Sequence, residues 1–180
     1  GPAYEKKRMW AVAGGKSTRL LVGTTGTESG YFAEFKGEKN AAVAGVGLVR
    51  IGPAGNVVKY ADDSVNALCA AGEKLWIGTS GNGLFSFDGR DTKIEIPPDI
   101  LKSGAIWRIF ESTDRSIWIA GQHGVLRVKD GPAEKVITAE DVRAVFVDRK
   151  QVWAATVTCG LLHVRPAAKF GWLVSSVGFG

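Results

Sequence analysis

Apolar and polar residues alternate in short runs along most of the chain, and turn residues separate these runs. Three runs carry a tryptophan at the same place: Leu75–Thr79, Ile117–Gly121 and Val152–Thr156. A weaker copy, Leu20–Thr24, has Leu21 in place of tryptophan. Alternation bounded by glycine, aspartate, asparagine and proline predicts short, half-buried strands. Because no stretch shows the 3.6-residue period of a helix, the pattern predicts an all-β chain.

A glycine-led apolar run follows each of these strands at a nearly constant interval. These runs are Gly47–Ile51, Gly83–Phe87, Gly124–Val128 and Gly160–Val164, and their glycines step by 36, 41 and 36 residues. Further strands are expected before each tryptophan-type run, at 9–12, 65–68, 106–110 and 142–146, and after each glycine-led run, at 56–60, 92–96, 134–137 and 168–170. Units of four short strands and about 40 residues are typical of propeller blades. The predicted fold is therefore a β-propeller of four-stranded antiparallel blades.

The repeat divides the chain into four blades and the two end strands of an incomplete fifth. The expected boundaries are 1–7 for an outer strand, 8–61, 62–97, 98–137 and 138–170 for the four blades, and 171–180 for an inner strand. Such an open ring leaves sheet edges and apolar faces in water. We therefore expect the missing strands to come from a second copy or from another segment of the polypeptide. A four-bladed ring with frayed ends is the alternative.

The strand Leu75–Thr79, the tight turn after it and the run Gly83–Phe87 resemble the two-component regulator propeller repeat, a bacterial blade type. Three units are similar to it throughout, and the first is similar only at its two ends. The resemblance implies a sensor portion of a bacterial signalling protein, with a periplasmic or other extracytoplasmic location. It also implies that some relatives sense carbohydrates. The motif identifies the type of blade and not the ligand.

In an up-and-down meander, the turns between second and third strands and the connections between blades collect on one face. The candidate ligand- or partner-binding residues on that face are Trp10, Asn66, Asn82, Trp107, Arg108, Gln122, His123, Arg143 and Thr158. Aromatic rings beside Arg, Asn and Gln in a concave site suit polar, planar or sugar-like ligands. Trp76, Trp118 and Trp153 are expected to pack between blades instead. For Trp10 and Trp107, packing and ligand contact both stay open.

The first blade departs from the repeat by an expected insertion of 19 residues, at about 25–44. It contains three aromatic residues and a lysine close together: Tyr31, Phe32, Phe35 and Lys36. Long loops in compact domains are usually functional or disordered, and this aromatic content argues against simple disorder. The segment is expected to cover the channel mouth, to grip a partner, or to form a hairpin that extends the blade.

The segment Ser112–Trp118 resembles, with one residue fewer, the turn motif of sialidase-type propellers. In such a turn the side chains of serine and aspartate accept or donate hydrogen bonds to the nearby backbone. We therefore expect this segment to cap a hairpin and to have no catalytic role.

Charge and composition exclude several function classes. The net charge of +5 is spread along the chain, and the one basic run, Lys6–Arg8, is too short for a nucleic-acid footprint. The segment Gly14–Thr18 lacks the first glycine of a phosphate-binding loop, since Trp10 stands there, and no helix is expected after it. No run of 18 apolar residues predicts a membrane-spanning segment. The 24 glycines and 6 tryptophans fit the many turns and inner strands of a propeller.

The two cysteines and two histidines do not predict a metal or redox site. Cys159 and His163 would be about 13 Å apart on a strand that rises roughly 3.3 Å per residue. Cys69 is expected on the face opposite Cys159, so a disulfide between them is not expected. Zinc requires three or four ligands. No cofactor or metal is therefore expected.

Three functions stay open from the sequence. The first is a non-catalytic sensor or binding module that presents loops to a small polar or carbohydrate ligand or to a protein. The second is a structural segment that another chain or segment completes. The third is a hydrolase or lyase whose site is shared with missing blades.

Overall fold

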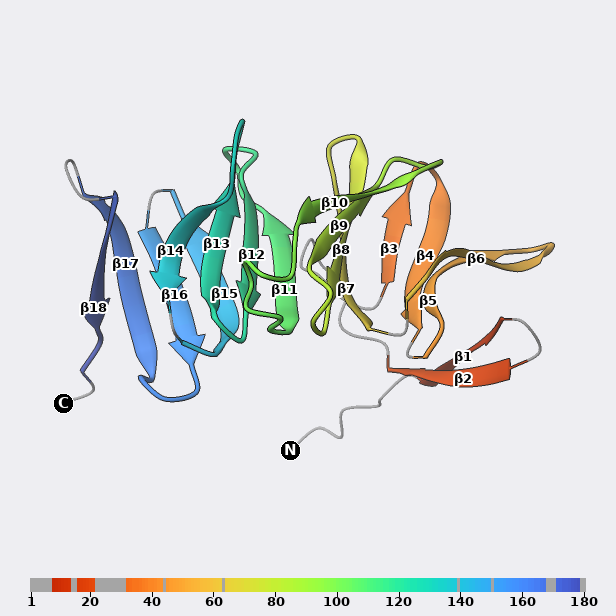
Figure 1. Cartoon of the computed structure of the whole chain (residues 1–180), viewed down its shortest axis with the longest axis horizontal. Coiled ribbons are helices and arrows are strands. Elements are labelled where there is room, and N and C mark those ends of the chain that lie inside the picture. Colours follow the sequence, from red (N-terminus) through yellow and green to blue (C-terminus); the bar gives the residue numbers. More distant parts are fainter. Residues whose placement is uncertain are drawn as a thin grey trace.

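The computed structural model describes residues 8–13, 16–21, 32–43, 45–62, 64–138, 140–149, 151–167 and 171–178. Throughout these residues the chain consists of strands, numbered β1 to β18 in Figure 1, and the turns between them. In this described part, no helix has the length and apolar character needed to cross a membrane. The expected all-β class is confirmed.

Sixteen strands form four sheets of four strands each, which we call the first to fourth blades. The first blade contains β3 (Phe32–Phe35), β4 (Glu38–Val43), β5 (Gly47–Gly52) and β6 (Gly55–Ala61), and the second contains β7 (Val65–Ala71), β8 (Lys74–Thr79), β9 (Leu84–Phe87) and β10 (Thr92–Ile96). The third contains β11 (Ile106–Glu111), β12 (Ile117–Gly121), β13 (Gly124–Val128) and β14 (Glu134–Thr138), and the fourth contains β15 (Val142–Asp148), β16 (Gln151–Thr156), β17 (Leu161–Ala167) and β18 (Gly171–Ser176). Within each blade, strands that follow one another in the chain pair antiparallel.

The repeated glycine that precedes or begins the third strand of each blade has a left-handed backbone. The φ angles of Gly47, Gly83, Gly124 and Gly160 are +118°, +98°, +118° and +69°. In the first three blades a Cβ at this glycine would lie 2.4 Å or less from a carbonyl oxygen of the outer strand. Glycine therefore supplies both the conformation and the space that let the fourth strand pair with the third.

Consecutive blades pack face to face, and alternate residues of each strand supply the two faces. We call the face of a blade that points to the next blade in the chain its outward face, and the other its inward face. The outward face of the second blade packs on the inward face of the third through Trp76, Ile109 and Ile119 among others. The third and fourth blades meet through a second cluster that includes Trp118 and Val152. Each interface is therefore an apolar core shared by two sheets.

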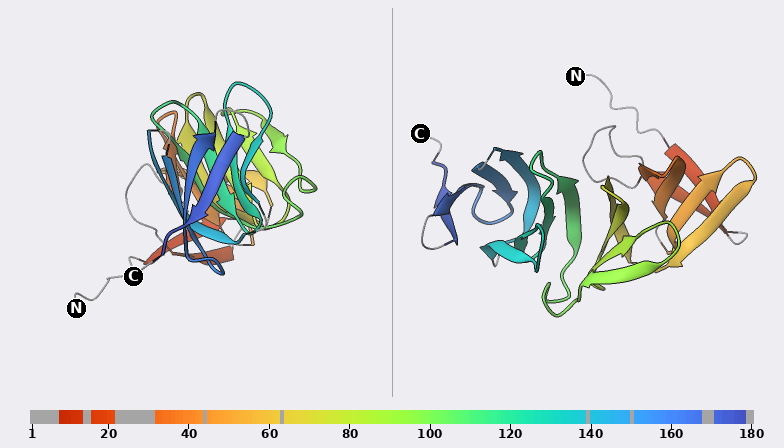
Figure 2. Two further views of the ribbon diagram at one scale, coloured as in Figure 1. Left: turned by 90° about the vertical axis from the view of Figure 1, so that its left-hand side faces the viewer. Right: turned by 90° about the horizontal axis from the view of Figure 1, so that it is seen from above.

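The four blades follow one another along the long axis of the molecule (Figure 1). Seen from above, the row of blades does not close into a ring, and the first and fourth blades lie at its two ends (Figure 2). The innermost strands β7, β11 and β15 contact one another in sequence. The architecture is therefore propeller-like, with four blades in an open arrangement.

The first blade is built from different strands than the repeat predicted. The expected strands at 9–12 and 20–24 overlap β1 (Arg8–Ala13) and β2 (Lys16–Leu21), which form a sheet of two strands within the described part of the chain. Positions 22–24 of the second strand lie outside the described residues. The expected insertion at about 25–44 instead contains β3 and β4, the first two strands of the blade. The repeat does not predict β4, because Asn40 occupies the position of the repeated tryptophan. The two positions are equivalent: Asn40 lies two residues before the partner of Leu48, and Trp76 lies two residues before the partner of Leu84.

The last strand also belongs to a different sheet than expected. The segment from residue 171 was assigned to the inner strand of a fifth blade, but β18 pairs with β17 as the outer strand of the fourth blade. Trp172 packs on the third blade, and its Nε1 donates to Glu134 Oε1 at 2.7 Å. The prediction of an inner strand at 171–180 was therefore wrong. The expected strands at 1–7 and 168–170 lie outside the described residues.

The turn at Ser112–Ser116 caps the hairpin between β11 and β12 as expected. Asp114 Oδ1 accepts the hydroxyl of Ser112 at 2.6 Å and the backbone N–H of Ser116 at 3.1 Å. The indole N–H of Trp118 donates to Ser112 Oγ at 3.0 Å. These side chains satisfy the polar groups of the turn itself, so its structural role is confirmed.

Candidate functional site

Three of the expected site residues occupy one equivalent position in successive blades. Asn66, Trp107 and Arg143 each sit in a β-bulge near the start of the innermost strand of the second, third and fourth blades. A bulge leaves one residue unpaired in the ladder and redirects its side chain. The repeat therefore places three different polar or aromatic side chains at equivalent positions, near the start of the innermost strand of each blade.

In the second and third blades the bulge residue ties its blade to the next one. Asn66 Nδ2 donates to the carbonyl of Ile106 at 2.7 Å, and Trp107 Nε1 donates to Asp141 Oδ1 at 2.8 Å. Arg143, in the fourth blade, turns back instead: it donates to Asp141 Oδ2 at 2.8 Å and lies 4.3 Å from the ring centroid of Trp107. The structure thus brings Trp107 and Arg143 together around one carboxylate.

Hydrogen bonding makes Asp141 a stable anion in this group. Partial burial alone would raise the pKa of Asp141, but hydrogen bonds from Arg143 and Trp107 outweigh that effect and lower it below the usual range. The positive charge of Arg143 acts in the same direction. The indole and guanidinium of this cluster are therefore already engaged by the protein.

In the second blade, hydrogen bonds join the turn after β8 to the connection between β6 and β7. Asn82 Nδ2 donates to both carboxylate oxygens of Asp62 at 3.2 Å and to Ser64 Oγ at 3.0 Å. Burial would raise the pKa of Asp62, but bonds from Ser64 and Asn82 lower it overall. Burial and the Asp62 carboxylate together raise the pKa of Tyr60 to about 12.

The corresponding group in the fourth blade contains the exposed cysteine. Thr158 Oγ1 donates to Glu140, and the Sγ of Cys159 lies 3.1 Å from the other oxygen of the same carboxylate. These hydrogen bonds lower the pKa of Glu140. Cys159 and Cys69 are both free thiols, and burial raises the pKa of Cys69 to about 11. Thr158 therefore helps to hold the connection between the third and fourth blades.

The other expected contacts lie elsewhere. Phe35 packs against Phe87 at 6.4 Å between ring centroids, and Lys36 Nζ donates to the carbonyl of Asp88 at 2.8 Å. Phe32 packs on the inward face of the first blade. These residues form a strand and the turn of a hairpin, which fits the hairpin alternative rather than a loop over a channel mouth. Arg108 is exposed on β11, while Tyr31 and the side chain of Trp10 lie outside the described residues.

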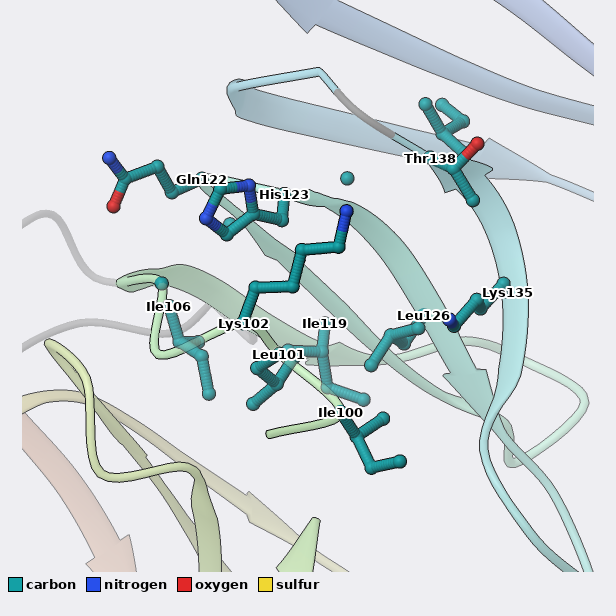
Figure 3. A pocket seen from close by; sticks show the side chains of 14 residues that line it. Ile100, Leu101, Lys102, Ile106, Ile119, Gln122, His123, Leu126, Lys135 and Thr138 are labelled. Carbon is teal, nitrogen blue, oxygen red and sulfur yellow. The ribbon is translucent and has the colours of Figure 1, made fainter. Parts of the chain in front are cut away.

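Gln122 and His123 stand at the mouth of a cavity of about 230 Å³ in the third blade. Its floor is aliphatic, from Ile100, Leu101, Ile106, Ile119, Leu126 and Ile137, and its polar side chains are Lys102, Gln122, His123, Lys135 and Thr138. Figure 3 shows the aliphatic side chains gathered below Lys102 and His123, with Lys135 and Thr138 on the neighbouring strand. No Asp or Glu belongs to the lining described for this cavity.

The connection from β10 to β11 builds one wall of this cavity. Its tight turn is held by backbone bonds from Lys102 to Asp99, from Ser103 to Pro98 and from Gly104 to Leu101. Lys102 and Ser103 both have left-handed backbones, with φ of +49° and +50°. Two consecutive non-glycine residues in this region are costly, and such strain tends to persist where the surrounding structure fixes a functional geometry. The turn presents Ile100, 44% exposed, at the edge of the cavity.

A second cavity, of about 390 Å³, lies between the third and fourth blades and includes Trp118 and Trp172. Its charges are mostly paired with one another. Arg127 bonds to Asp114 at 3.0 Å and to Glu134 at 3.5 Å, and Lys129 bonds to Asp114 at 3.1 Å. By contrast, no described residue forms a side-chain hydrogen bond or ion pair with Lys102 or Lys135. The first cavity is therefore the better candidate for a ligand site.

The sequence predicted Gln122 and His123 but missed Ile100, Lys102 and Lys135. The connection at 97–105 could have been noticed for its apolar pair between two prolines and a glycine. Lys135 could not, because β14 reaches the cavity only through the pairing of the blade. Among the described residues, no group of three or more His, Cys, Asp or Glu side chains is placed to hold a metal ion.

Comparisons with known proteins add little to this picture. No family model matches the chain, and no curated protein matches it. The chain is similar to the crystal structure of the extracellular domain of a hybrid two component system from B. thetaiotaomicron, with 14% identity and a TM-score of 0.47. The match covers 95% of this chain and spans 29% of the length of that chain. Because this TM-score does not establish a shared fold, the architecture rests on the strand pairing of the chain itself.

Proposed function

We propose that this chain is a non-catalytic binding module that takes a small ligand in the cavity of the third blade. The observation that carries the proposal is a preformed cavity with an aliphatic floor and two lysines, Lys102 and Lys135, that have no partner among the described side chains. Ligand sites commonly combine an apolar lining with a few placed polar groups. The cavity of about 230 Å³ is below the usual range for drug-sized ligands, so the ligand is small.

A sensor role in a larger bacterial signalling protein, outside the cytoplasm, belongs to the same proposal. It rests on the resemblance of Leu75–Thr79 and Gly83–Phe87 to the two-component regulator propeller repeat. The binding role rests on the cavity and is independent of that resemblance. Each part can therefore fail without the other.

The binding role is tested with the purified chain and a mixture of small molecules that includes neutral sugars, amines, carboxylates and alcohols. Saturation-transfer NMR identifies which molecules bind, and spectra of the recovered mixture show whether any was converted. We expect binding without conversion, and we expect the variant Leu126→Gln to lose it. Conversion of a bound molecule would favour the hydrolase or lyase alternative, and absence of any binding would contradict the proposal. Circular dichroism of the variant controls for its folding.

A second candidate function, assembly with another protein surface, is supported by the outward face of the fourth blade. On this face Phe146 is 64% exposed and Leu173 is 50% exposed. The equivalent faces of the second and third blades are covered by the next blade. Exposed apolar sheet faces of this kind favour association. Completion by a second copy or by another segment would cover it.

Sedimentation velocity over a range of concentrations tests self-association through this face. If the partner is a second copy, the chain should associate, and Phe146→Ser should shift it to monomer. The exposed Ile94→Ser in the second blade serves as the matched control and should leave association unchanged. A chain that stays monomeric at every concentration would exclude the second copy as the partner.

A further inference from the structure

We propose that the cavity of the third blade selects a small amphipathic anion, a carboxylate with a short apolar body, rather than a sugar. This inference rests on the proposed binding function and names its ligand class. Three features of the cavity favour such a ligand: its aliphatic floor, the charge at its mouth, and the turn that connects them.

The floor of the cavity suits an apolar body. Ile106, Ile119 and Leu126 are 7% exposed or less in the free chain, and Ile119 and Leu126 belong to the core between the second and third blades. None of the lining residues is Phe, Tyr or Trp. A sugar ring would find no Phe, Tyr or Trp ring to stack on, and the aliphatic floor would leave the hydroxyl groups that face it without partners, so their desolvation would be poorly compensated. An alkyl or small cyclic hydrocarbon group loses nothing by leaving water there.

The mouth of the cavity suits a negative charge. Lys102 and Lys135 bring two ammonium groups to a lining without carboxylates, and neither has a partner among the described side chains. Gln122 adds an amide, although its Oε1 already accepts the backbone N–H of Ala105 at 3.3 Å. The carboxylate of Asp141 accepts hydrogen bonds from Trp107 and Arg143 and does not belong to the lining of the cavity. A ligand carboxylate would therefore meet cations that the protein leaves unpaired.

The turn from Asp99 to Gly104 links these two features. Ile100 and Leu101 supply apolar surface, and the left-handed backbone of Lys102 carries the ammonium from the same turn. The imidazole of His123 lies against Gly104 so closely that a Cβ there would be 2.4 Å from its Cδ2. A larger residue at position 104 would push His123 away from the mouth. The apolar edge and the polar mouth are thus set by one fixed turn.

The test uses three probes that share one chain and differ in charge: octanoate, 1-octanol and octylammonium. Isothermal titration calorimetry of the full chain at pH 7.5 measures their affinities. We expect octanoate to bind about fivefold more tightly than octanol, as for one partly exposed charge pair, and octylammonium to bind more weakly than both. Equal affinities, or a preference for octylammonium, would overturn the inference.

Variants test whether the turn from Asp99 to Gly104 causes the preference for octanoate. Lys102→Asn tolerates the left-handed backbone and removes one of the two ammonium groups, so it should reduce the octanoate preference while leaving octanol binding unchanged. Lys93→Asn, on the outer strand of the second blade, is the matched control and should leave all three affinities unchanged. Ile100→Ser should weaken all three probes by a similar factor. A Lys102→Asn chain that keeps the full preference would contradict the assignment.

These outcomes separate the inference from the proposed function. If neutral sugars compete with octanoate and bind more tightly, the module still binds ligands and only the ligand class is wrong. If neither the probes nor the wider mixture bind, the binding function itself fails. If octanoate binds but Leu126→Gln and Lys102→Asn both bind it normally, the cavity is not the site, and the inference fails.

Discussion

The third and fourth blades share one repeat pattern, but among the described residues only the third has a neighbouring blade on its outward face. Trp118 in the third blade is 3% exposed because the fourth blade packs against it. Trp153 holds the same position in the fourth blade and stays half-buried, with the imidazole of His163 stacked on it at 4.1 Å. The repeat therefore sets where each tryptophan points, and the next blade decides whether it becomes core.

The cross-strand partners of these tryptophans show the same contrast. Phe110 stacks with Trp118 at 6.3 Å between centroids inside the interface, whereas Phe146, the pairing partner of Trp153, is 64% exposed. Arg127 lies 5.7 Å from the Trp118 ring and bonds to carboxylates of its own blade. Equivalent strand pairing thus gives a closed interface in one blade and an open surface in the other.

The largest expected effect comes from removing the two tryptophans. Trp118→Ala should lower the free energy of unfolding by about 4 kcal/mol, because it leaves a cavity in a closed core. Trp153→Ala should lower it by only about 1 kcal/mol, because much of that ring is already in water. Urea unfolding, followed by circular dichroism, measures both. Equal losses would mean that the outward face of the fourth blade is covered in solution.

Replacing the repeated glycine should likewise destabilise the third blade more than the fourth. A Cβ on Gly124 would lie 2.0 Å from the carbonyl oxygen of Ile137, whereas a Cβ on Gly160 meets no atom within 4 Å. Gly124→Ala should therefore lower the free energy of unfolding by about 3 kcal/mol, through clash and backbone strain together. Gly160→Ala should cost about 1 kcal/mol from the left-handed backbone alone. A larger loss for Gly160→Ala, in the same urea experiment, would contradict this account.

The smallest effect concerns the hairpin turns and depends on pH. Burial alone would raise the pKa of Asp114, but hydrogen bonds from Ser112, Ser116 and Lys129 hold it well below its ordinary value. Because the pKa is lower in the folded chain, the ionised carboxylate stabilises the fold at pH values above 3.8, the pKa in the unfolded chain. This stabilisation is lost progressively as the pH falls below 3.8. Asp114→Asn should thus cost about 1 kcal/mol at pH 7, since the side chain is 41% exposed, and less as the pH falls below 3.8.

Asp148→Asn, in the corresponding turn of the fourth blade, is the control for this prediction. Asp148 is exposed, so its replacement should change the free energy of unfolding by less than about 0.5 kcal/mol. Thermal unfolding of both variants between pH 3 and pH 7 provides the comparison. A loss for Asp114→Asn that stays constant over this range would show that the charge of Asp114 does not stabilise the turn.

Much of the strand order could be predicted from the sequence, because the tryptophan and glycine positions report local geometry. The exceptions were positions where one residue breaks the pattern. Asn40 replaces the tryptophan in β4, and it is buried with no described hydrogen-bond partner for its Oδ1. The segment at Trp172 has the apolar pattern of an inner strand. It is nevertheless an outer strand, because it pairs with the edge of β17 and Trp172 packs against Trp118. Pattern alone does not distinguish these two positions.

The candidate site was predictable only in part, for a related reason. The common position of Asn66, Trp107 and Arg143 followed from the repeat, but their bonds to neighbouring blades depend on packing. The cavity combines a connection, a turn and an outer strand of one blade, and Lys135 reaches it only through the irregular pairing of β13 with β14. Such convergence of distant segments leaves no local signal in the sequence.

The most direct test of a ligand cavity in the third blade is hydrogen–deuterium exchange with and without octanoate. Bound octanoate should slow exchange in peptides that cover 98–105 and 121–138, which surround the cavity. Peptides that cover 142–156, on the inner half of the fourth blade, should exchange at unchanged rates. Slower exchange confined to the fourth blade, or no change at 98–105 under conditions where calorimetry shows binding, would contradict the account.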